Sequence, residues 1–235
     1  MRAGVFMTPA ELDPTLVEGA TIVVVDVIRA ATTIVEALAN GARAIYPTSS
    51  TEDAVRLAAS LGREDTLLCG ERGTLKIEGF HLGNSPAEFA PAVVEGKRIV
   101  LSTTNGTAAL SAVRELPRVL TGAFVNLSAV ADAVRADPDV IVVCAGRAGR
   151  FALDDAACAG HLLRRIGGDR ELNDAARAAW KLAGGVRPGP RFLADTEAGR
   201  ALLAHGLADD LKVCGQVDRH VVVPQLRDQA LVAGG

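Results

Sequence analysis

Short runs of β-branched residues alternate along the chain with stretches rich in alanine and leucine. Two runs, TIVVVDVI at residues 21–28 and VIVVCA at residues 140–145, are almost continuously apolar. Such runs are typical of parallel strands covered on both faces, because a strand with one solvated face would alternate apolar and polar residues. The pattern therefore predicts buried strands at both positions.

The remaining elements follow from weaker signals of the same kind. Shorter β-branched runs predict strands at 44–46, 66–69, 98–102, 119–121 and 220–223. Helical spacing of apolar residues predicts helices over 32–39, 51–61, 106–116, 127–135 and 154–166, and a mostly helical chain from residue 173, with a loop at 187–190. Pro47 and Pro224 are expected to end the strands before them, since proline cannot donate to a ladder. The alternation predicts an α/β fold with three layers, α/β/α, around a largely parallel or mixed sheet.

No linker rich in Pro, Gly or Ser divides the chain, so we expect residues 1–235 to form one compact α/β unit. Residues 26–38 show a weak internal similarity to residues 102–110, because both pass from a strand end through a threonine-rich turn into an Ala/Leu helix. Two interpretations stay open: two similar, intertwined halves, or the ordinary repetitiveness of βαβ units.

Composition narrows the choice of partners. Lys and Arg number 25 against 28 Asp and Glu, and the formal net charge is −3. A general nucleic-acid binder normally shows a basic excess, so we expect no nucleic-acid partner. A small anionic ligand stays compatible, since a few arginines in one cleft create a local positive field.

Nothing in the sequence predicts a membrane partner. No apolar run approaches the roughly 18–20 residues of a membrane span, and residues 1–10 lack an apolar signal region. The four cysteines form no CxxC pair and are predicted to be buried thiols in a reducing compartment. We therefore expect a cytoplasmic protein.

Candidate chemistry is expected where strands end, because ligands of open parallel sheets bind beyond the carboxyl ends of the strands, near helix N-termini. Asp26 lies inside the first apolar run or at the end of its strand, and Arg29 follows three residues later. A carboxylate in apolar surroundings is unfavourable unless it is paired, hydrogen-bonded or bound to a metal. An Asp26–Arg29 pair, a helix cap, and a metal ligand or nucleophile all fit these residues.

Two polar segments are candidates for the same site. Residues 70–86 (GERGTLKIEGFHLGNSP) form a long Gly-rich segment that carries Glu71 and Arg72. The segment lacks the Walker pattern of nucleotide-binding loops. Its last residues, Asn84-Ser85-Pro86, are also explained as the cap of a short helix. Residues 102–107 (STTNGT) offer hydroxyl, amide and backbone N–H groups before a helix, and more of them than a cap requires. We therefore predict an anion site at residues 102–107.

A third segment follows the second apolar run. Residues 144–150 (CAGRAGR) carry Arg147, and Asp154 and Asp155 open the next helix. Acids at a helix N-terminus ordinarily interact with the helix dipole. Together with Asp26 and Glu71 they could instead hold Mg²⁺, which prefers oxygen ligands. The sequence shows no histidine metal spacing and no GxSxG or Cys/His signature of a covalent hydrolase.

Taken together, these segments resemble the 2-phosphosulfolactate phosphatase family, which is linked to coenzyme M biosynthesis. The resemblance spans roughly residues 20–165 and rests on the order of DVIRA with Thr32-Thr33, GERG, Gly79-Phe80, GNSP, TTNGT, and Asp155 with Ala159-Gly160. Three positions depart from the family's pattern: Ala31 replaces a hydroxyl residue, His81 replaces Asp, and Asp154 replaces Glu. The shorter Asp154 carboxylate would change its reach toward a metal.

The resemblance implies a Mg²⁺-dependent phosphatase of α/β/α architecture that converts 2-phospho-3-sulfolactate to 3-sulfolactate and phosphate. Such a small, strongly anionic phosphate ester needs local cations, which Mg²⁺ and arginines would supply. The catalytic residues implied are Asp26, Arg29, Arg72 and Asn105. The metal ligands implied are Asp26, Glu71 and Asp155. The substrate-binding residues implied are Thr32, Thr33, Asn84, Ser85, Thr103, Thr104, Gly106, Thr107 and Arg147.

Alternatives stay open inside and outside this class. The chain could act on another 2-phosphorylated hydroxy acid, because a sulfonate pocket cannot be identified in the sequence, or it could be a non-catalytic anion-binding protein. Water could attack the phosphorus directly, or Asp26 could first form a phosphoryl-aspartate. The acidic residues favour catalysis, since an anion binder without metal gains nothing from carboxylates that face phosphate. A homodimer is compatible with a chain of this size.

Overall fold

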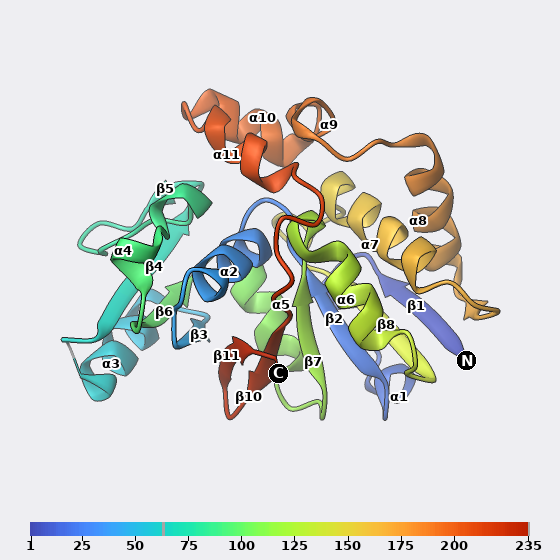
Figure 1. The fold of residues 1–235 in the computed structure, drawn as a ribbon, viewed down its shortest axis with the longest axis horizontal. Coiled ribbons are helices and arrows are strands. Elements are labelled where there is room, and N and C mark those ends of the chain that lie inside the picture. The colour runs from blue at the N-terminus through green and yellow to red at the C-terminus, as the bar shows by residue number, and fades with distance from the viewer. Residues whose placement is uncertain (63, 235) are drawn as a thin grey trace.

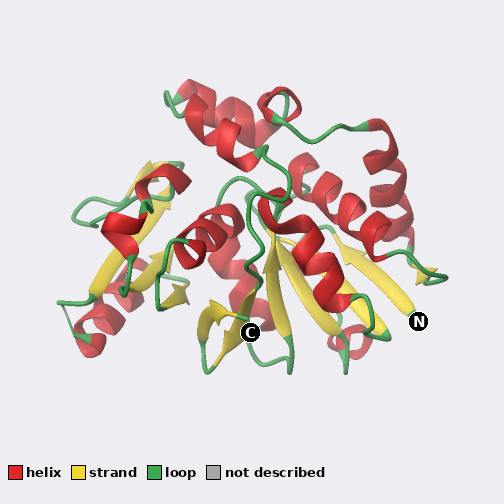
Figure 2. Cartoon of the chain, in the orientation of Figure 1, coloured by secondary structure: helices red, strands yellow, loops and turns green. Residues whose placement is uncertain are grey.

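One mixed sheet with helices on both faces forms an α/β/α structure in the computed structural model, which describes residues 1–62 and 64–234 (Figures 1 and 2). Its strands lie in the order β5-β4-β6-β3-β11-β10-β7-β2-β8-β1-β9. Their bounds are β1 Arg2–Phe6, β2 Thr21–Val25, β3 Ala44–Thr48, β4 Thr66–Arg72, β5 Leu75–Lys76, β6 Arg98–Ser102, β7 Val119–Gly122, β8 Asp139–Cys144, β9 Glu171–Leu172, β10 Pro224–Arg227 and β11 Ala230–Ala233. The predicted fold class is confirmed.

Helices connect most of the strands. The α-helices are α1 Pro14–Val17, α2 Ala30–Ala39, α3 Thr51–Leu61, α4 Pro91–Val94, α5 Gly106–Val113, α6 Leu127–Val134, α7 Leu153–Ile166, α8 Asp174–Gly185, α9 Pro190–Ala194, α10 Glu197–Ala204 and α11 Ala208–Cys214. Three 3₁₀ turns are η1 Pro9–Glu11, η2 Pro86–Glu88 and η3 Phe124–Asn126. Within the described ranges, no helix is both long enough and apolar enough to cross a membrane.

Apart from the short edge strand β5, which pairs antiparallel with β4, the sheet consists of two parallel blocks joined by an antiparallel hairpin. Strands β4, β6 and β3 form one block, and β7, β2, β8, β1 and β9 form the other. The hairpin β10–β11 lies between them and pairs with each block through a single residue pair, Leu231 with Ile45 and Gln225 with Leu120. The chain crosses between the blocks through α2 and again through α5. Whether the blocks are related copies stays a prediction.

The continuous apolar run of β2 is explained by burial on both faces of the sheet. Val23 and Val25 pack in the core that includes α6, α7 and α8, whereas Ile22 and Val24 pack in the core that includes α2 and α5. Successive side chains of a strand point to opposite faces, so a strand covered on both sides has no solvated position. The same argument applies to β8, whose residues Val140–Cys144 also divide between the two cores.

Two predicted strand ends differ from the structure, and some strands were missed. The strand predicted at 220–223 is wrong, because Pro224 begins β10 instead of ending a strand. A proline fits the first residue of a strand, where its missing N–H costs little. Pro47 does not end its strand either, since β3 continues to Thr48 while β11 pairs with it only at Ile45. Strand β1 was not predicted, because its few apolar residues are interrupted by Gly4.

Helices α9, α10 and α11 form a cap over one end of the sheet. In Figure 1 these helices, coloured orange to red, stand above the end of β2 and the start of α2. Helix α11 packs on η2 and on α9 and α10. The cap, defined as residues 190–214, therefore covers the region where several parallel strands end.

Candidate active site

A cleft of about 210 Å³ opens under the cap, where β2, β4, β6 and β8 end. The wall of this cleft contains these sequence-predicted residues: Asp26, Arg29, Glu71, Asn84, Thr103, Thr104, Asn105 and Arg147. It also contains residues that were not predicted: Ile28, Gly73, Thr74, Ala148, Ala198 and Leu202. The fold thus brings together segments that lie more than a hundred residues apart, at the strand ends where ligands of such sheets bind.

Asp26 follows β2 directly and caps the start of α2. Its Oδ1 accepts a hydrogen bond from the Ala30 N–H at 3.1 Å, and its main-chain oxygen accepts from the Ala31 N–H at 3.0 Å. Burial raises the pKa of Asp26 to about 7, and the neighbouring Asp154 and Glu71 charges act in the same direction. Asp26 thus accepts the first N–H of α2, which fits the helix-cap alternative that the sequence left open. A carboxyl group with this pKa exchanges its proton near neutral pH, as acid–base groups of active sites do.

Glu71 holds two parts of the cleft wall together. This side chain near the end of β4 accepts hydrogen bonds from the Thr74 N–H at 2.8 Å and the Thr104 N–H at 2.7 Å, one on each carboxylate oxygen. Charge-assisted bonds of this kind are stronger than neutral ones. The carboxylate therefore fixes the loop after β4 against the turn after β6.

The turn at residues 103–105 faces the cleft at the start of α5. The Asn105 Oδ1 accepts a hydrogen bond from the Ala148 N–H at 2.9 Å, which links the segment after β6 to the segment after β8. The Thr107 hydroxyl donates to the Thr103 carbonyl at 2.8 Å, so it serves the turn and does not line the cleft. The cleft is thus adjacent to the N-terminus of α5, where partial positive charge favours anions.

Gly106 contributes to the site by its lack of a side chain. A Cβ there would stand 2.4 Å from the Ala30 Cβ and 2.6 Å from the Asp26 Oδ2. These distances are far shorter than van der Waals contact, so only glycine lets α5 approach the start of α2 this closely. Gly106 does not line the cleft, and its role here is close packing against Asp26.

Several predicted site residues use their polar groups in hydrogen bonds to other parts of the protein. The Thr32 and Thr33 hydroxyls donate to the carbonyls of Val27 and Asn84, at 2.8 and 3.0 Å. The Arg72 guanidinium donates to the Glu71 carbonyl and the Ser102 hydroxyl, each at 2.8 Å. None of these three side chains lines the cleft. Their ligand-binding and catalytic roles stay predictions.

Asp155 lies behind the cleft wall. Its two oxygens accept from the Val27 N–H at 2.8 Å and the Gly146 N–H at 3.0 Å, and burial raises its pKa well above the ordinary range. Among the described residues, no three His, Cys, Asp or Glu side chains stand close enough together to share a metal ion. The structure therefore does not bring Asp26, Glu71 and Asp155 together as one three-carboxylate cluster.

Two carboxylates of the cleft do fit a magnesium ion. Asp26 and Glu71 both line the wall. Asp26 is 5% exposed and has one oxygen committed to the Ala30 N–H, whereas each Glu71 oxygen accepts one main-chain N–H and has its other lone pair left for a metal. Mg²⁺ is usually bound through one or two carboxylates, with water and substrate phosphate completing its shell. The donor set of the cleft suits that arrangement, whereas Asp155 would act from behind it.

Arg29 pairs with a residue that sequence reasoning missed. Its Nη1 donates to the Asp210 Oδ2 on α11 at 2.7 Å, so the Asp26–Arg29 ion pair considered from the sequence is wrong. The two partners lie 181 positions apart, and no local pattern connects them. Ala198 and Leu202 of α10 were missed for a similar reason, because their four-residue spacing looks like any apolar helix face.

The fold and the cleft define an α/β/α protein that gathers carboxylates and arginines around space for a small anionic ligand. A family model described as 2-phosphosulpholactate phosphatase matches residues 6–229, and the chain belongs to this family of phosphatases. The resemblance inferred from the motifs is confirmed.

Relatives named probable 2-phosphosulfolactate phosphatase match nearly the whole chain. The one from Gloeobacter violaceus is 42% identical over 233 residues, which cover 96% of this chain and 95% of the relative. The one from Caldanaerobacter subterraneus subsp. tengcongensis is 39% identical over 214 residues, 88% of each chain. The one from Thermotoga petrophila is 38% identical over 211 residues, 89% of this chain and 90% of the relative.

Proposed function

We propose that this protein hydrolyses a phosphate monoester of a small 2-hydroxy acid with the help of Mg²⁺, and that 2-phospho-3-sulfolactate is its substrate. The observation that carries the proposal is the meeting of Asp26, Glu71 and Arg29 in one cleft beside the turn at residues 103–105. The family match and the names of the relatives support the choice of substrate.

The residues of the cleft have distinct roles in this proposal. Arg29 and Arg147 attract the anionic groups of the substrate and offset the charge that gathers on the phosphoryl oxygens. The partial positive charge at the N-terminus of α5 acts in the same direction. Asp26 either takes a proton from the attacking water or attacks the phosphorus itself, and the two routes differ in whether a phosphorylated protein forms.

Asp26 and Glu71 would hold the magnesium ion. When bound, the ion supplies positive charge that polarises the phosphoryl group. Asp155 would keep Asp26's surroundings in place by holding the Val27 and Gly146 N–H groups. A third direct ligand from the protein is not required, because substrate and water complete the shell of Mg²⁺.

Phosphate release from phosphosulfolactate and from phospholactate, each with Mg²⁺ and with EDTA, tests the proposal. Metal-dependent release that favours the sulfonate supports it in full. Equal or faster release from phospholactate keeps a phosphatase but removes the named substrate. No release from either ester, together with retained phosphate binding, would instead identify an anion-binding protein.

The proposal also covers the cellular compartment, the pathway and the partners of the protein. The four cysteines are buried and free, which suits the reducing cytoplasm. A product that carries a sulfonate suits coenzyme M biosynthesis. We propose no nucleic-acid partner, because the net charge is −3. A homodimer stays a prediction that sedimentation equilibrium can test.

A further inference from the structure

Helix α11 carries a buried carboxylate whose hydrogen-bond partners belong to the cleft wall and its support. Asp210 is 3% exposed. Its Oδ2 accepts from the Arg29 Nη1 at 2.7 Å, and its Oδ1 accepts from the Ser85 hydroxyl at 2.5 Å. Both oxygens are therefore engaged, one by the start of α2 and the other by the residue that precedes η2.

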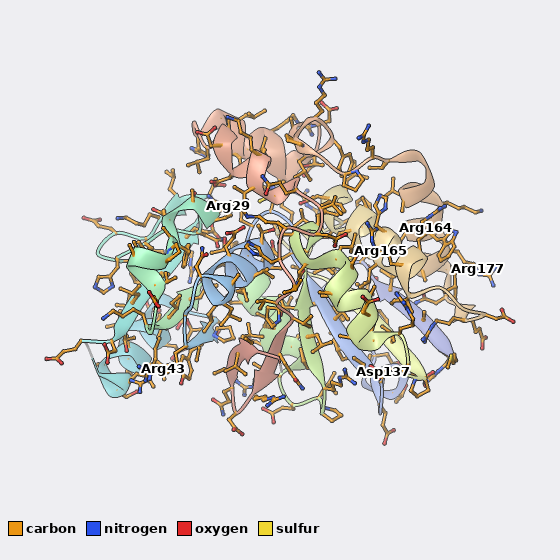
Figure 3. All side chains as sticks on the ribbon, in the orientation of Figure 1. Arg29, Arg43, Asp137, Arg164, Arg165 and Arg177 are labelled. Atoms are coloured by element: carbon orange, nitrogen blue, oxygen red, sulfur yellow. The ribbon has the colours of Figure 1, made fainter. Side chains whose placement is uncertain are left out.

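Arg29 has donors left over after these contacts. Its side chain is 4% exposed, and its Nη2 donates to the Thr74 carbonyl at 2.7 Å. A guanidinium carries five N–H donors in a fixed plane, and the bonds to Asp210 and Thr74 use two of them. Arg29 also lines the cleft. In Figure 3 it lies between α2 and the cap.

The plane of the guanidinium is set by its two fixed partners. A buried arginine without a carboxylate would be an uncompensated charge, and a single bond would leave the planar group free to turn. Asp210 and the Thr74 carbonyl hold two different nitrogen atoms, so they fix both the position and the direction of the remaining donors. The remaining donors belong to a side chain that lines the cleft, and their direction depends on Asp210 staying in place.

Asp210 also connects the cap to the cleft. Helix α11 packs on η2, and α10 contributes Ala198 and Leu202 to the cleft wall. The Asp210 side chain is thus the charged contact between the cap and both Arg29 and Ser85. A correctly seated cap and a correctly aimed Arg29 depend on the same carboxylate.

We propose that Asp210 is a positioning residue that aims the Arg29 guanidinium at the phosphoryl group of the substrate. The inference rests on the proposed function, because it concerns how the same cleft treats its ligand. Asp210 does not touch the reacting atoms, and all of its effect on the reaction passes through Arg29.

A double-mutant cycle tests this dependence. Asp210→Asn keeps the size of the side chain but removes its charge, and Arg29→Lys keeps the charge but removes the planar fork. The two single variants, the double variant and the wild type are compared in kcat, KM and thermal midpoint. Asp209→Asn is the matched control, because Asp209 precedes Asp210 on α11 and its side chain forms an exposed ion pair with Lys212.

We expect Asp210→Asn to lower kcat/KM roughly 10–100-fold, mainly through kcat, since small misplacements of a catalytic group cost about that much. The double variant should be no slower than Arg29→Lys alone, because the group that Asp210 positions is already lost. Asp209→Asn should stay within about twofold of the wild type. Retained activity in Asp210→Asn, or losses that multiply in the double variant, overturn the proposal.

Binding of inorganic phosphate, followed by calorimetry, separates this inference from the proposed function. If the wild type releases no phosphate from any ester but binds phosphate, the proposed hydrolysis fails. The affinity for phosphate is then measured for the same four proteins of the double-mutant cycle. Non-additive losses of affinity support the role of Asp210, and additive losses overturn it. A wild type that neither hydrolyses esters nor binds phosphate overturns both.

If Asp210→Asn does not fold, Ser85→Ala is used as the alternative variant for testing the role of Asp210. It removes one of the two contacts of Asp210 and leaves the Arg29 pair in place. We expect a smaller loss of kcat/KM, which should disappear when Ser85→Ala is combined with Arg29→Lys. A loss that persists at full size in the Arg29→Lys background contradicts the proposal.

Discussion

Buried carboxylates around the cleft accept main-chain N–H groups from segments that are distant in the sequence. Asp155 joins the segment after β2 to the segment after β8, and Glu71 joins the loop after β4 to the turn after β6. Each carboxylate thus organises two loops by charge-assisted hydrogen bonds in surroundings where an unpaired N–H is costly. These residues build the cleft as well as give it negative charge.

The substitution Glu71→Gln should loosen the cleft wall. Glutamine has one acceptor oxygen, so its amide group would face a main-chain N–H, of Thr74 or Thr104, that now lacks an acceptor. We expect the free energy of unfolding to fall by about 1–3 kcal/mol, measured by urea titration, and phosphate release to fall with it. The exposed Glu78→Gln is the control, and equal effects of the two variants would contradict this account.

The substitution Gly106→Ala tests the close approach of α5 and α2. The added methyl group would collide with the Ala30 Cβ and the Asp26 Oδ2. We expect a loss of about 1–3 kcal/mol in unfolding free energy and a large loss of phosphate release, because Asp26 must move. Gly185→Ala, whose Cβ would meet nothing within 4 Å, should leave both quantities nearly unchanged.

At the scale of elements, the local sequence predicted the bounds of helices and strands whose ends are marked by nearby residues, such as a capping side chain. Helix α3 spans Thr51–Leu61 as predicted, and the Ser50 hydroxyl caps it by accepting the Asp53 N–H at 3.0 Å. Strand β6 also has its predicted bounds. The final hairpin was missed because its residues are set by pairing with β3 and β7, which a local pattern does not show.

The packing of α7 against the end of α8 predicts a dependence of stability on pH. Burial lowers the pKa of His161, whose Nε2 contacts the Val186 carbonyl at 2.9 Å. The unfolded chain then binds the proton more tightly than the folded chain, so stability is complete above about pH 6.5 and falls as the pH drops toward the lowered pKa.

Urea titrations at pH 7.5 and pH 5.5 measure this effect. The wild type should lose more stability between the two pH values than His161→Gln does, since glutamine keeps an N–H donor without a titrating group. Other groups that titrate in this range cancel in the comparison. The exposed His205→Gln should behave like the wild type, and an unchanged pH dependence in His161→Gln would contradict the assignment.

At the scale of the whole molecule, the C-terminal segment joins the two blocks of the sheet. The buried Glu36 on α2 accepts from the Arg219 Nε at 2.7 Å and lies 2.8 Å from the His220 Nε2. The Asn126 side chain then donates to the Val222 carbonyl at 2.9 Å, and the hairpin that follows lies between β3 and β7. This C-terminal segment therefore completes the sheet between its two parallel blocks.

Leu231→Ala should destabilise the whole molecule. Leu231 is fully buried between the blocks and pairs with Ile45. Truncation of such a side chain costs about 2–5 kcal/mol because it leaves a cavity. Thermal or urea unfolding should show this loss in one cooperative transition. Val221→Ala, at a side chain that is 88% exposed, should change the midpoint little; a similar loss in both variants would contradict the role of the hairpin.

The sequence by itself determined the α/β class, the two continuously buried strands β2 and β8, the best-capped helices and the family. It also located most of the cleft, since Asp26, Asn105 and Arg147 follow strands that periodicity identifies, and parallel strands bring such ends together. Only the tertiary structure decided which polar groups face the ligand. It paired Arg29 with Asp210 and left Thr32 to bond the backbone. The physical reason is that a buried polar group takes whichever partner packing brings within about 3 Å, and sequence distance does not enter that choice.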